Sequence, residues 1–142
     1  MTPKQYLNQY RRAYTVVRLA ASRLEQAEHD AAGIRAIIYS DMPKSHNVER
    51  DLSDAMIRIE EMSNLYREAV KTNTAIMSEV SAVIMQVPDH QQMEILWLRY
   101  IEMRTWKEIP DIIHLTERWM HSLHSRGLQA VERILKDSSE IQ

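Results

Sequence analysis

The strongest constraint on the fold is an uninterrupted apolar series that runs through residues 52–87. Its members are spaced alternately by three and four residues: Leu52, Ala55, Ile59, Met62, Tyr66, Ala69, Asn73, Ile76, Val80, Val83 and Val87. This spacing places side chains along one face of an α-helix, in the pattern of a coiled-coil seam. We therefore predict a helix from about Glu49 to Val87, which would be about 58 Å long at ~1.5 Å per residue. The polar member, Asn73, either fixes the register of the seam from a buried position or faces solvent.

A second apolar series precedes the first along the chain. It comprises Leu7, Tyr10, Tyr14, Val17, Ala21, Leu24, Ala31 and Ile38, with interruptions at Glu28 and Arg35. This series predicts a helix from Pro3 to Tyr39, in which Gly33 weakens or bends the helix. The polar stretch from Ser40 to Asn47 contains a proline and has no period, so we expect a loop at about residues 40–48. Two helices of matching length joined by a short loop predict an antiparallel hairpin over residues 1–88.

The second helix carries more apolar residues than a hairpin seam needs. The additional residues are Met56, Ile57, Leu65, Val70, Met77 and Ile84. A broad apolar stripe indicates a further layer of helix packing. This layer is either the C-terminal part of the chain or a second copy, in a homodimer formed through the N-terminal hairpin.

Composition supports an all-α fold and argues against several kinds of site. The chain has 142 residues, two glycines and no cysteine. So few glycines leave little room for the tight turns of a sandwich or barrel, and the absence of cysteine excludes disulfides and thiolate metal sites. The chain has no Gly-rich phosphate loop, no Gly-x-Ser-x-Gly and no His-Glu-x-x-His. We therefore predict no enzyme activity, no cofactor and no metal.

Hydropathy and charge bear on location and partners. The apolar runs are shorter than the ~18–20 residues that a membrane span needs, so we expect a cytoplasmic protein without membrane partners. Net charge is −2, but residues 1–40 carry six Lys and Arg against three Asp and Glu, whereas residues 41–89 carry five against nine. This imbalance suits two helices that lie side by side, although ordinary solvated faces are the simpler interpretation.

Short helices follow Pro88, which ends the second long helix. We predict a C-terminal domain over residues 89–142 with three helices. The first runs from Gln91 to Glu102, the second follows Thr105 and ends at about Ile113, and the third runs from Thr116 to about Leu135. Thr105-Trp106-Lys107-Glu108 has the pattern of a capping box, and His114-Leu115 of a turn. Two helices joined by a short turn form the helix-turn-helix plan, in which the second helix can enter the major groove of DNA.

The last helix has the two faces that this plan requires. Met120 and Leu123 lie on its apolar side. Its polar side presents Glu117, Arg118, His121, Ser122, Ser125 and Arg126. Arginine suits guanine O6 and N7, a carboxylate can accept from cytosine N4, and the helix N-terminus near Thr116 can meet a phosphate. By pattern alone, such helices also occur in proteins that do not bind nucleic acid.

Two stretches of this domain carry a family resemblance. Residues 96–109 read LWLRYIEMRTWKEI and resemble the LxLRYxxGxxWxEIA stretch of sigma-70 region 4; residues 116–128 read TERWMHSLHSRGL and resemble its SERxVxRLHxRAL recognition helix. With the long N-terminal hairpin, and with residues 6–9 and 40–45, the chain resembles small sigma-like proteins of phages and prophages, described as ArpU/RinA-type late transcription regulators.

The resemblance implies sequence-specific promoter binding by residues 90–136, regulation of transcription, and an opportunity for contact with RNA polymerase. It implies DNA-facing roles for Arg118, His121, Ser122 and Arg126, with Lys107 and Thr116 near phosphates. The chain departs from the family pattern at four positions. Pro110 stands in place of an alanine, His114 and Met103 stand in place of glycines, and Ser122 stands in place of an arginine. If His114 is left-handed, strain of about 1 kcal/mol follows.

Other interpretations of these residues remain open. A DNA-packaging protein of the terminase small-subunit kind uses the same helical plan, and a protein–protein interaction module would not bind DNA at all. Glu117, His121 and His124 could imitate a metal site, although solvated polar positions on a helix are the simpler interpretation. Trp97 and Trp106 are expected in the core, whereas Trp119 has equal claim to the outer face.

Overall fold

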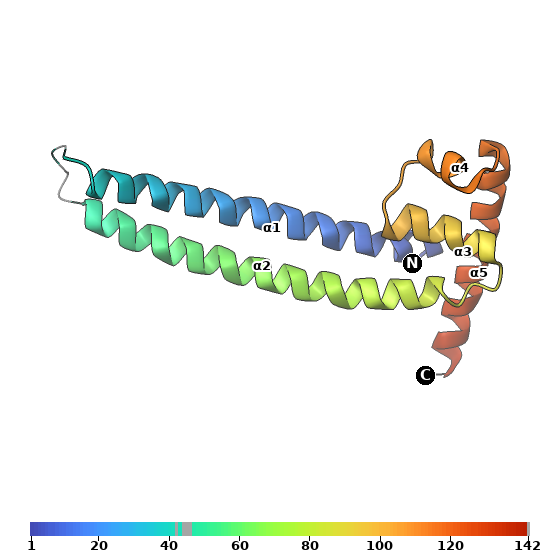
Figure 1. The fold of residues 1–142 in the computed structure, drawn as a ribbon. Helices are drawn as coiled ribbons and strands as arrows, with labels where there is room; N and C mark the ends of the chain where they lie inside the picture. The colour runs from blue at the N-terminus through green and yellow to red at the C-terminus, as the bar shows by residue number, and fades with distance from the viewer. Residues whose placement is uncertain (42, 44–46, 142) are drawn as a thin grey trace. The chain divides into compact units, whose positions relative to one another are not determined.

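The computed structural model describes residues 1–41, 43 and 47–141 (Figure 1). Within this part of the chain the regular structure is helical and contains no strand. The elements are α1 (Pro3–Ile38), α2 (Val48–Ile84), α3 (His90–Leu96), the π-helical turn η1 (Trp97–Ile101), α4 (Glu108–Ile113) and α5 (Glu117–Ile141). The prediction of an all-α protein with a long N-terminal helical hairpin is therefore confirmed. Residues 42 and 44–46, in the expected loop and in the family resemblance, lie outside the described residues.

The packing divides the chain into two compact units. One unit comprises residues 1–13 together with 73–142, and the other comprises residues 14–72. We expected a single boundary at residue 88, between the N-terminal hairpin and the C-terminal helices. The contacts instead group the first 13 residues and the end of α2 with the short C-terminal helices.

Helix α1 begins with a reciprocal cap that the sequence analysis overlooked. The Thr2 hydroxyl accepts from the Gln5 N–H at 3.1 Å, and the Gln5 side chain accepts from the Thr2 N–H at 2.9 Å. Pro3 is the first helical residue, where a missing N–H costs nothing. These two hydrogen bonds fix the start of α1.

The apolar series of α2 forms the buried side of that helix as predicted. Every member from Leu52 to Val83 is at least partly buried, and Val80 is 1% exposed. The helix ends at Ile84 rather than at Val87 as predicted, and Val87, also 1% exposed, is buried beyond the helix end. Asn73 is half-buried, and its side-chain oxygen is shielded from solvent without a hydrogen-bond partner. The seam position of Asn73 is thus confirmed.

The series predicted for α1 was wrong in one respect. We expected interruptions at Glu28 and Arg35, but the buried side continues through Ala27, which is 3% exposed, and half-buried Ile34. Ala27 and Ile34 each precede Glu28 and Arg35 by one residue, which is a rotation of about 100° around the helix and brings their side chains onto the seam. Likewise Ala13 is buried, whereas Tyr14 is 43% exposed. Helix α1 also continues through Gly33.

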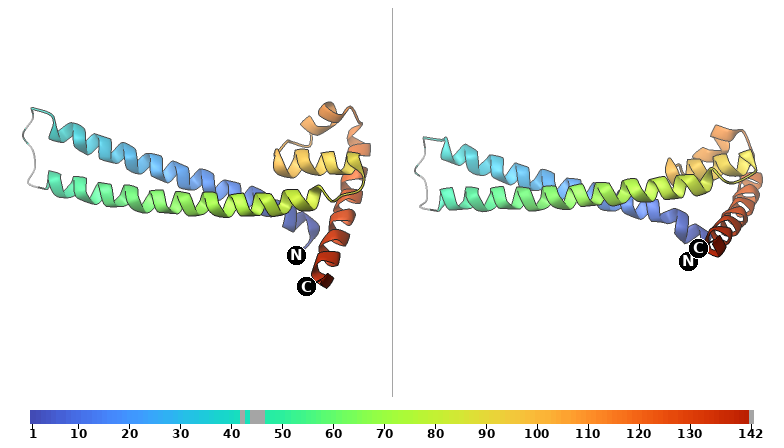
Figure 2. Two further views of the ribbon diagram at one scale, coloured as in Figure 1. Left: turned by 60° about the horizontal axis from the view of Figure 1, so that its bottom comes forward. Right: turned by 90° about the horizontal axis from the view of Figure 1, so that it is seen from below.

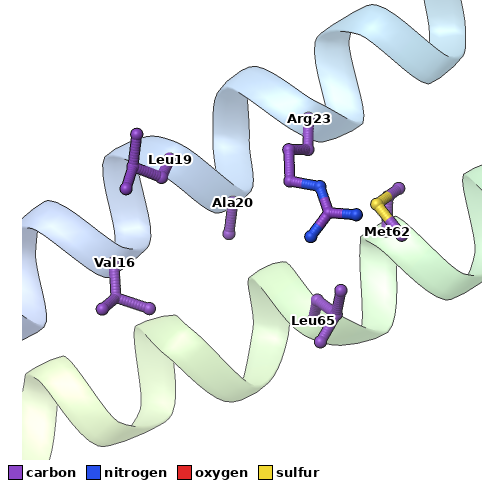
Figure 3. Close-up of a pocket in the computed structure, with 6 residues that line it drawn as sticks. All are labelled: Val16, Leu19, Ala20, Arg23, Met62 and Leu65. Atoms are coloured by element: carbon purple, nitrogen blue, oxygen red, sulfur yellow. The ribbon is translucent and has the colours of Figure 1, made fainter.

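The unit of residues 14–72 exposes apolar side chains on both of its helices. Val16, Leu19 and Ile37 on α1, and Ile57 and Leu65 on α2, are each about half exposed. Between the helices lies an apolar groove of about 190 Å³ (Figure 3). It is lined by Val16, Leu19, Ala20, Arg23, Met62 and Leu65. In Figure 3 the guanidinium of Arg23 extends from α1 toward α2 beside Met62.

The other unit has a core built from segments far apart in the sequence. Leu7 and Tyr10 of α1 pack with the end of α2, with α3 and η1, and with the later turns of α5. Its buried members are Leu7, Tyr10, Val80, Val83, Ile84, Val87, Leu96, Tyr100, Ile101, Ala130 and Val131. The start of α1 and the end of α5 lie close together in both views of Figure 2 and line a common surface hollow. Ile84, one of the surplus apolar residues of α2, is fully buried in this core.

Candidate nucleic-acid interface

The capping box predicted before α4 is present. The Glu108 N–H donates to the Thr105 hydroxyl at 3.2 Å, and the Thr105 N–H donates to the Glu108 carboxylate at 3.3 Å. Pro110 falls in the first turn of this short helix, where few N–H groups have an intrahelical partner. The helix therefore accommodates the proline that the family pattern lacks.

The turn between α4 and α5 is left-handed at His114, with φ 55° and ψ 43°. The N–H groups of His114 and Leu115 both donate to the Pro110 carbonyl, which closes the end of α4. The Thr116 hydroxyl then accepts from the Trp119 N–H at 3.2 Å and caps α5. These contacts give the helix–turn–helix connectivity predicted for residues 105–128.

A second left-handed residue, Met103, follows η1 with φ 58°. At the end of η1 the Glu102 N–H donates to the Trp97 carbonyl at 3.1 Å, the i to i+5 bond of a π-helix. Met103 and His114 both occupy positions where the family pattern has glycine. Because a Cβ atom is strained in this conformation, the backbone explains why glycine would suit both positions.

The inner side of α5 is anchored in a small core. Met120 and Leu123 are 0% and 3% exposed, and they pack with Ile95, Leu98 and Ile109. Trp106, Ile113 and Leu115 lie against the same core. The expectation that Met120 and Leu123 hold α5 from behind is confirmed.

Gly127 allows α5 to approach α3 closely, which the sequence analysis did not anticipate. A Cβ at this position would lie 3.2 Å from Leu96 Cδ1 and 3.5 Å from Gln92 Cβ. Leu96 itself is fully buried. The spacing between these two helices therefore depends on the absence of a side chain at Gly127.

The candidate DNA-facing residues lie mainly on the outer side of α5. Arg118, His121 and Ser125 are exposed and recur at the three-to-four-residue spacing of one helical face, with half-buried Ser122 beside them. The remaining candidates, Lys107, Thr116, Glu117 and Arg126, are also exposed. Lys107 precedes α4 rather than lying on α5. The chain's own described residues thus leave this face open.

Arg126 and Trp119 form one edge of this face. The Arg126 guanidinium lies 5.2 Å from the centre of the Trp119 ring. Trp119 is 42% exposed, whereas Trp97 and Trp106 are half-buried against the two cores. The expectations for Trp97 and Trp106 are confirmed, and Trp119 faces outward.

His121 and Trp106 form the opposite edge. The His121 and Trp106 rings lie 5.0 Å apart, and the Arg99 guanidinium lies 4.4 Å from the centre of the Trp106 ring. Arg99 also donates to the Arg104 carbonyl at 3.0 Å. On the outer side, His121 Nε2 lies 3.9 Å from the Glu117 carboxylate. This edge therefore runs from the Arg99 guanidinium through the rings of Trp106 and His121 to the Glu117 carboxylate.

His124 is buried, so the solvated position that we expected for it was wrong. It is 7% exposed, shares a 2.9 Å hydrogen bond with the Tyr100 hydroxyl, and meets Trp106 edge-on with ring centres 4.6 Å apart. Burial, followed by the charges of Lys4, His121 and Arg99, lowers the pKa of His124 to about 4. His124 is therefore neutral at pH 7, and Tyr100 gives its ring nitrogen a partner.

The described residues contain no cluster of His, Asp and Glu side chains suited to a metal ion. In the same part of the chain, none of the helices has the length and apolar character needed to cross a membrane. Comparisons with family models, with curated proteins and with solved structures found no match to this chain. The exposed side of α5 is therefore the feature of this chain that bears on function.

Proposed function

We propose that this protein is a sequence-specific duplex-DNA-binding regulator of transcription, of the phage or prophage type that resembles sigma-70 region 4. The N-terminal half of α5 would enter the major groove of promoter DNA. A contact with RNA polymerase would accompany this binding if the regulatory mechanism follows the family that the sequence resembles.

The observation that carries the proposal is the division of α5 into two sides. Met120 and Leu123 are buried, while Arg118, His121 and Ser125 are exposed on the opposite side. A helix that reads bases needs this combination of a fixed backbone and free polar side chains, mainly in its first turns. The left-handed turn at His114 and the Thr116 cap place those turns directly after α4.

The chemistry of the exposed residues suits base edges and phosphates. Arg118 and Arg126 can each donate two hydrogen bonds to guanine, a contact that discriminates by about 1–3 kcal/mol against the wrong base. Glu117 can accept from cytosine, and His121, Ser122 and Ser125 offer shorter polar contacts. Lys107 and the capped N-terminus at Thr116 suit backbone phosphates.

The test begins with selection of bound duplexes from a random-sequence pool, followed by fluorescence anisotropy over a salt series. Arg118→Ala and Arg126→Ala should each weaken binding to the selected duplex by about tenfold or more and relax its sequence preference. Arg133→Ala is the matched control, because Arg133 is an exposed arginine of the same helix, beyond the candidate face. Circular dichroism melts confirm that each variant is folded.

The possible outcomes separate the competing functions. If the wild-type chain shows no salt-dependent binding to duplex DNA, an interaction module without DNA binding is the better explanation. If it binds duplex DNA and is recovered with a packaging nuclease rather than with RNA polymerase, a terminase small-subunit-like role replaces transcription regulation. Equal affinity of the wild type and both arginine variants would discard the proposed contact residues.

Self-association through the N-terminal hairpin stays a prediction. Exposed apolar residues on both helices of the unit 14–72, such as Leu19 and Leu65, are the side chains that a second copy would cover. Sedimentation equilibrium should show a dimer for the wild type and a monomer for Leu19→Glu. A monomeric wild type at micromolar concentration would contradict the prediction.

A further inference from the structure

The first 24 residues of the chain contain five Lys and Arg residues and no Asp or Glu. Three of these cations, Lys4, Arg11 and Arg12, belong to the compact unit that also contains α5. The proposed function does not use them. We therefore considered which ligand these cations could bind.

The helical spacing places two of these cations on one stripe of α1. Lys4 is three residues before Leu7, and Arg11 is four residues after it, so all three point to the same side. Leu7 is fully buried in the core that contains Tyr100 of η1. Lys4 and Arg11 thus lie one turn before and one turn after the buried Leu7 on the same side of α1, whereas Arg12 is about 100° further round the helix.

Arg99 connects this stripe to the candidate face of α5. It precedes Tyr100 in η1, and its guanidinium lies 4.4 Å from the centre of the Trp106 ring. The other neighbour of that ring is His121, with ring centres 5.0 Å apart. A continuous path of contacts therefore leads from Arg99 through Trp106 to the exposed polar side of α5.

The electrostatics agree with this placement. Burial, followed by the positive charge of Arg11, lowers the pKa of Arg99. Burial, followed by the charges of Lys4, His121 and Arg99, lowers the pKa of His124. The charges of Lys4 and Arg11 thus act on Arg99 and His124, residues of the same compact unit.

We infer that Lys4 and Arg11 of α1, together with Arg99 of η1, form a backbone-contacting flank that binds the phosphates of duplex DNA beside α5. This inference rests on the proposed function. The phosphate ridges of both strands border the major groove, so a helix within the groove has room for cations on both of its sides. Arg126 beside Trp119 occupies one edge of α5, and the flank of Lys4, Arg11 and Arg99 extends the other.

The experiment measures affinity for two duplexes, the selected sequence and a random 30-base-pair duplex, over a series of salt concentrations. Lys4→Gln and Arg11→Gln should each weaken binding to both duplexes about three- to tenfold and reduce the salt slope by about 1, with sequence preference unchanged. Arg11→Lys should keep the wild-type slope. Arg12→Gln is the matched control and should change neither quantity.

Each outcome has a definite meaning. If Lys4→Gln and Arg11→Gln bind as the wild type does while Arg118→Ala loses affinity, the flank is wrong and the proposed function stands. If Arg12→Gln reduces affinity and slope as much as Arg11→Gln, general net charge explains the effect and the flank is again wrong. If the wild type binds neither duplex, the proposed function and this inference fail together. Lys4 is exposed, so Lys4→Gln decides the matter even if Arg11→Gln unfolds the protein.

Discussion

The Tyr100 hydroxyl and His124 Nε2 lie 2.9 Å apart inside the C-terminal helices, and this hydrogen bond joins η1 to α5. Burial raises the pKa of Tyr100 and lowers the pKa of His124 to about 4, so both groups are held in their neutral forms. His124 is three residues after His121 on α5 and lies on the inner side of that helix.

Stability should decrease below pH 6.5 because of His124. Above that pH the His124 ring is neutral in both the folded and the unfolded chain, so the free energy of unfolding is not reduced by its protonation. Between pH 6.5 and about 4 the unfolded chain binds a proton that the folded chain does not, so about 2 kcal/mol of unfolding free energy should be lost across this window. Urea titrations followed by tryptophan fluorescence measure this loss. A His124→Gln variant with the same pH dependence would contradict the assignment.

Glycine should relieve the left-handed turns. His114 is exposed, so His114→Gly should raise the free energy of unfolding by about 0.5–1 kcal/mol. Met103→Gly should gain less, because Met103 also packs against the core that contains Leu7. His114→Ala is the control, since alanine keeps the Cβ that causes the strain. A gain for alanine equal to that for glycine would rule out backbone strain as the cause.

Replacement of the two glycines by larger residues should change the stability of the protein in opposite directions. A Cβ at Gly33 meets nothing within 4 Å, so Gly33→Ala should stabilise helix α1 by about 0.5–1 kcal/mol. At Gly127 the nearest atom is 3.2 Å away on buried Leu96, and Gly127→Leu should destabilise by about 1–3 kcal/mol or more. Thermal melts of the two variants provide the comparison. Tolerance of leucine at Gly127 would show that α3 and α5 can move apart at little cost.

The shielded oxygen of Asn73 should reduce stability relative to an apolar residue. Asn73→Leu should raise the free energy of unfolding by about 1 kcal/mol, because a polar atom without a partner is removed and apolar area is added. Asn64→Leu serves as the control, since Asn64 is exposed on the same helix and should show no gain. Destabilisation by Asn73→Leu would instead support a role for Asn73 in fixing the register of α2.

The long helices could be predicted because each signal is local. The α2 series repeats without a gap, and the caps at Thr105 and Thr116 depend on residues three positions apart. The phase of α1 was harder to predict, because Ala27 and Ala13 are small residues whose burial depends on the opposing helix. Alanine alone does not distinguish a close helix contact from an exposed position.

Other features depend on contacts between distant parts of the chain. His124 is four residues after Met120 and therefore lies on the buried side of α5, but its partners there, Tyr100 and Trp106, come from other segments of the chain. The exposed candidates of α5, by contrast, followed directly from its amphipathic pattern.

Because Leu7 and Tyr10 share a core with Ala130 and Val131, that core cannot close until synthesis has passed residue 131. During translation Leu7 and Tyr10 lack these partners until more than a hundred further residues have left the ribosome. Contacts between residues so far apart in the sequence slow folding. A fragment that starts at residue 89 would lack the α1 and α2 residues of this core. Biochemical work on α5 therefore requires a chain that includes the first turns of α1.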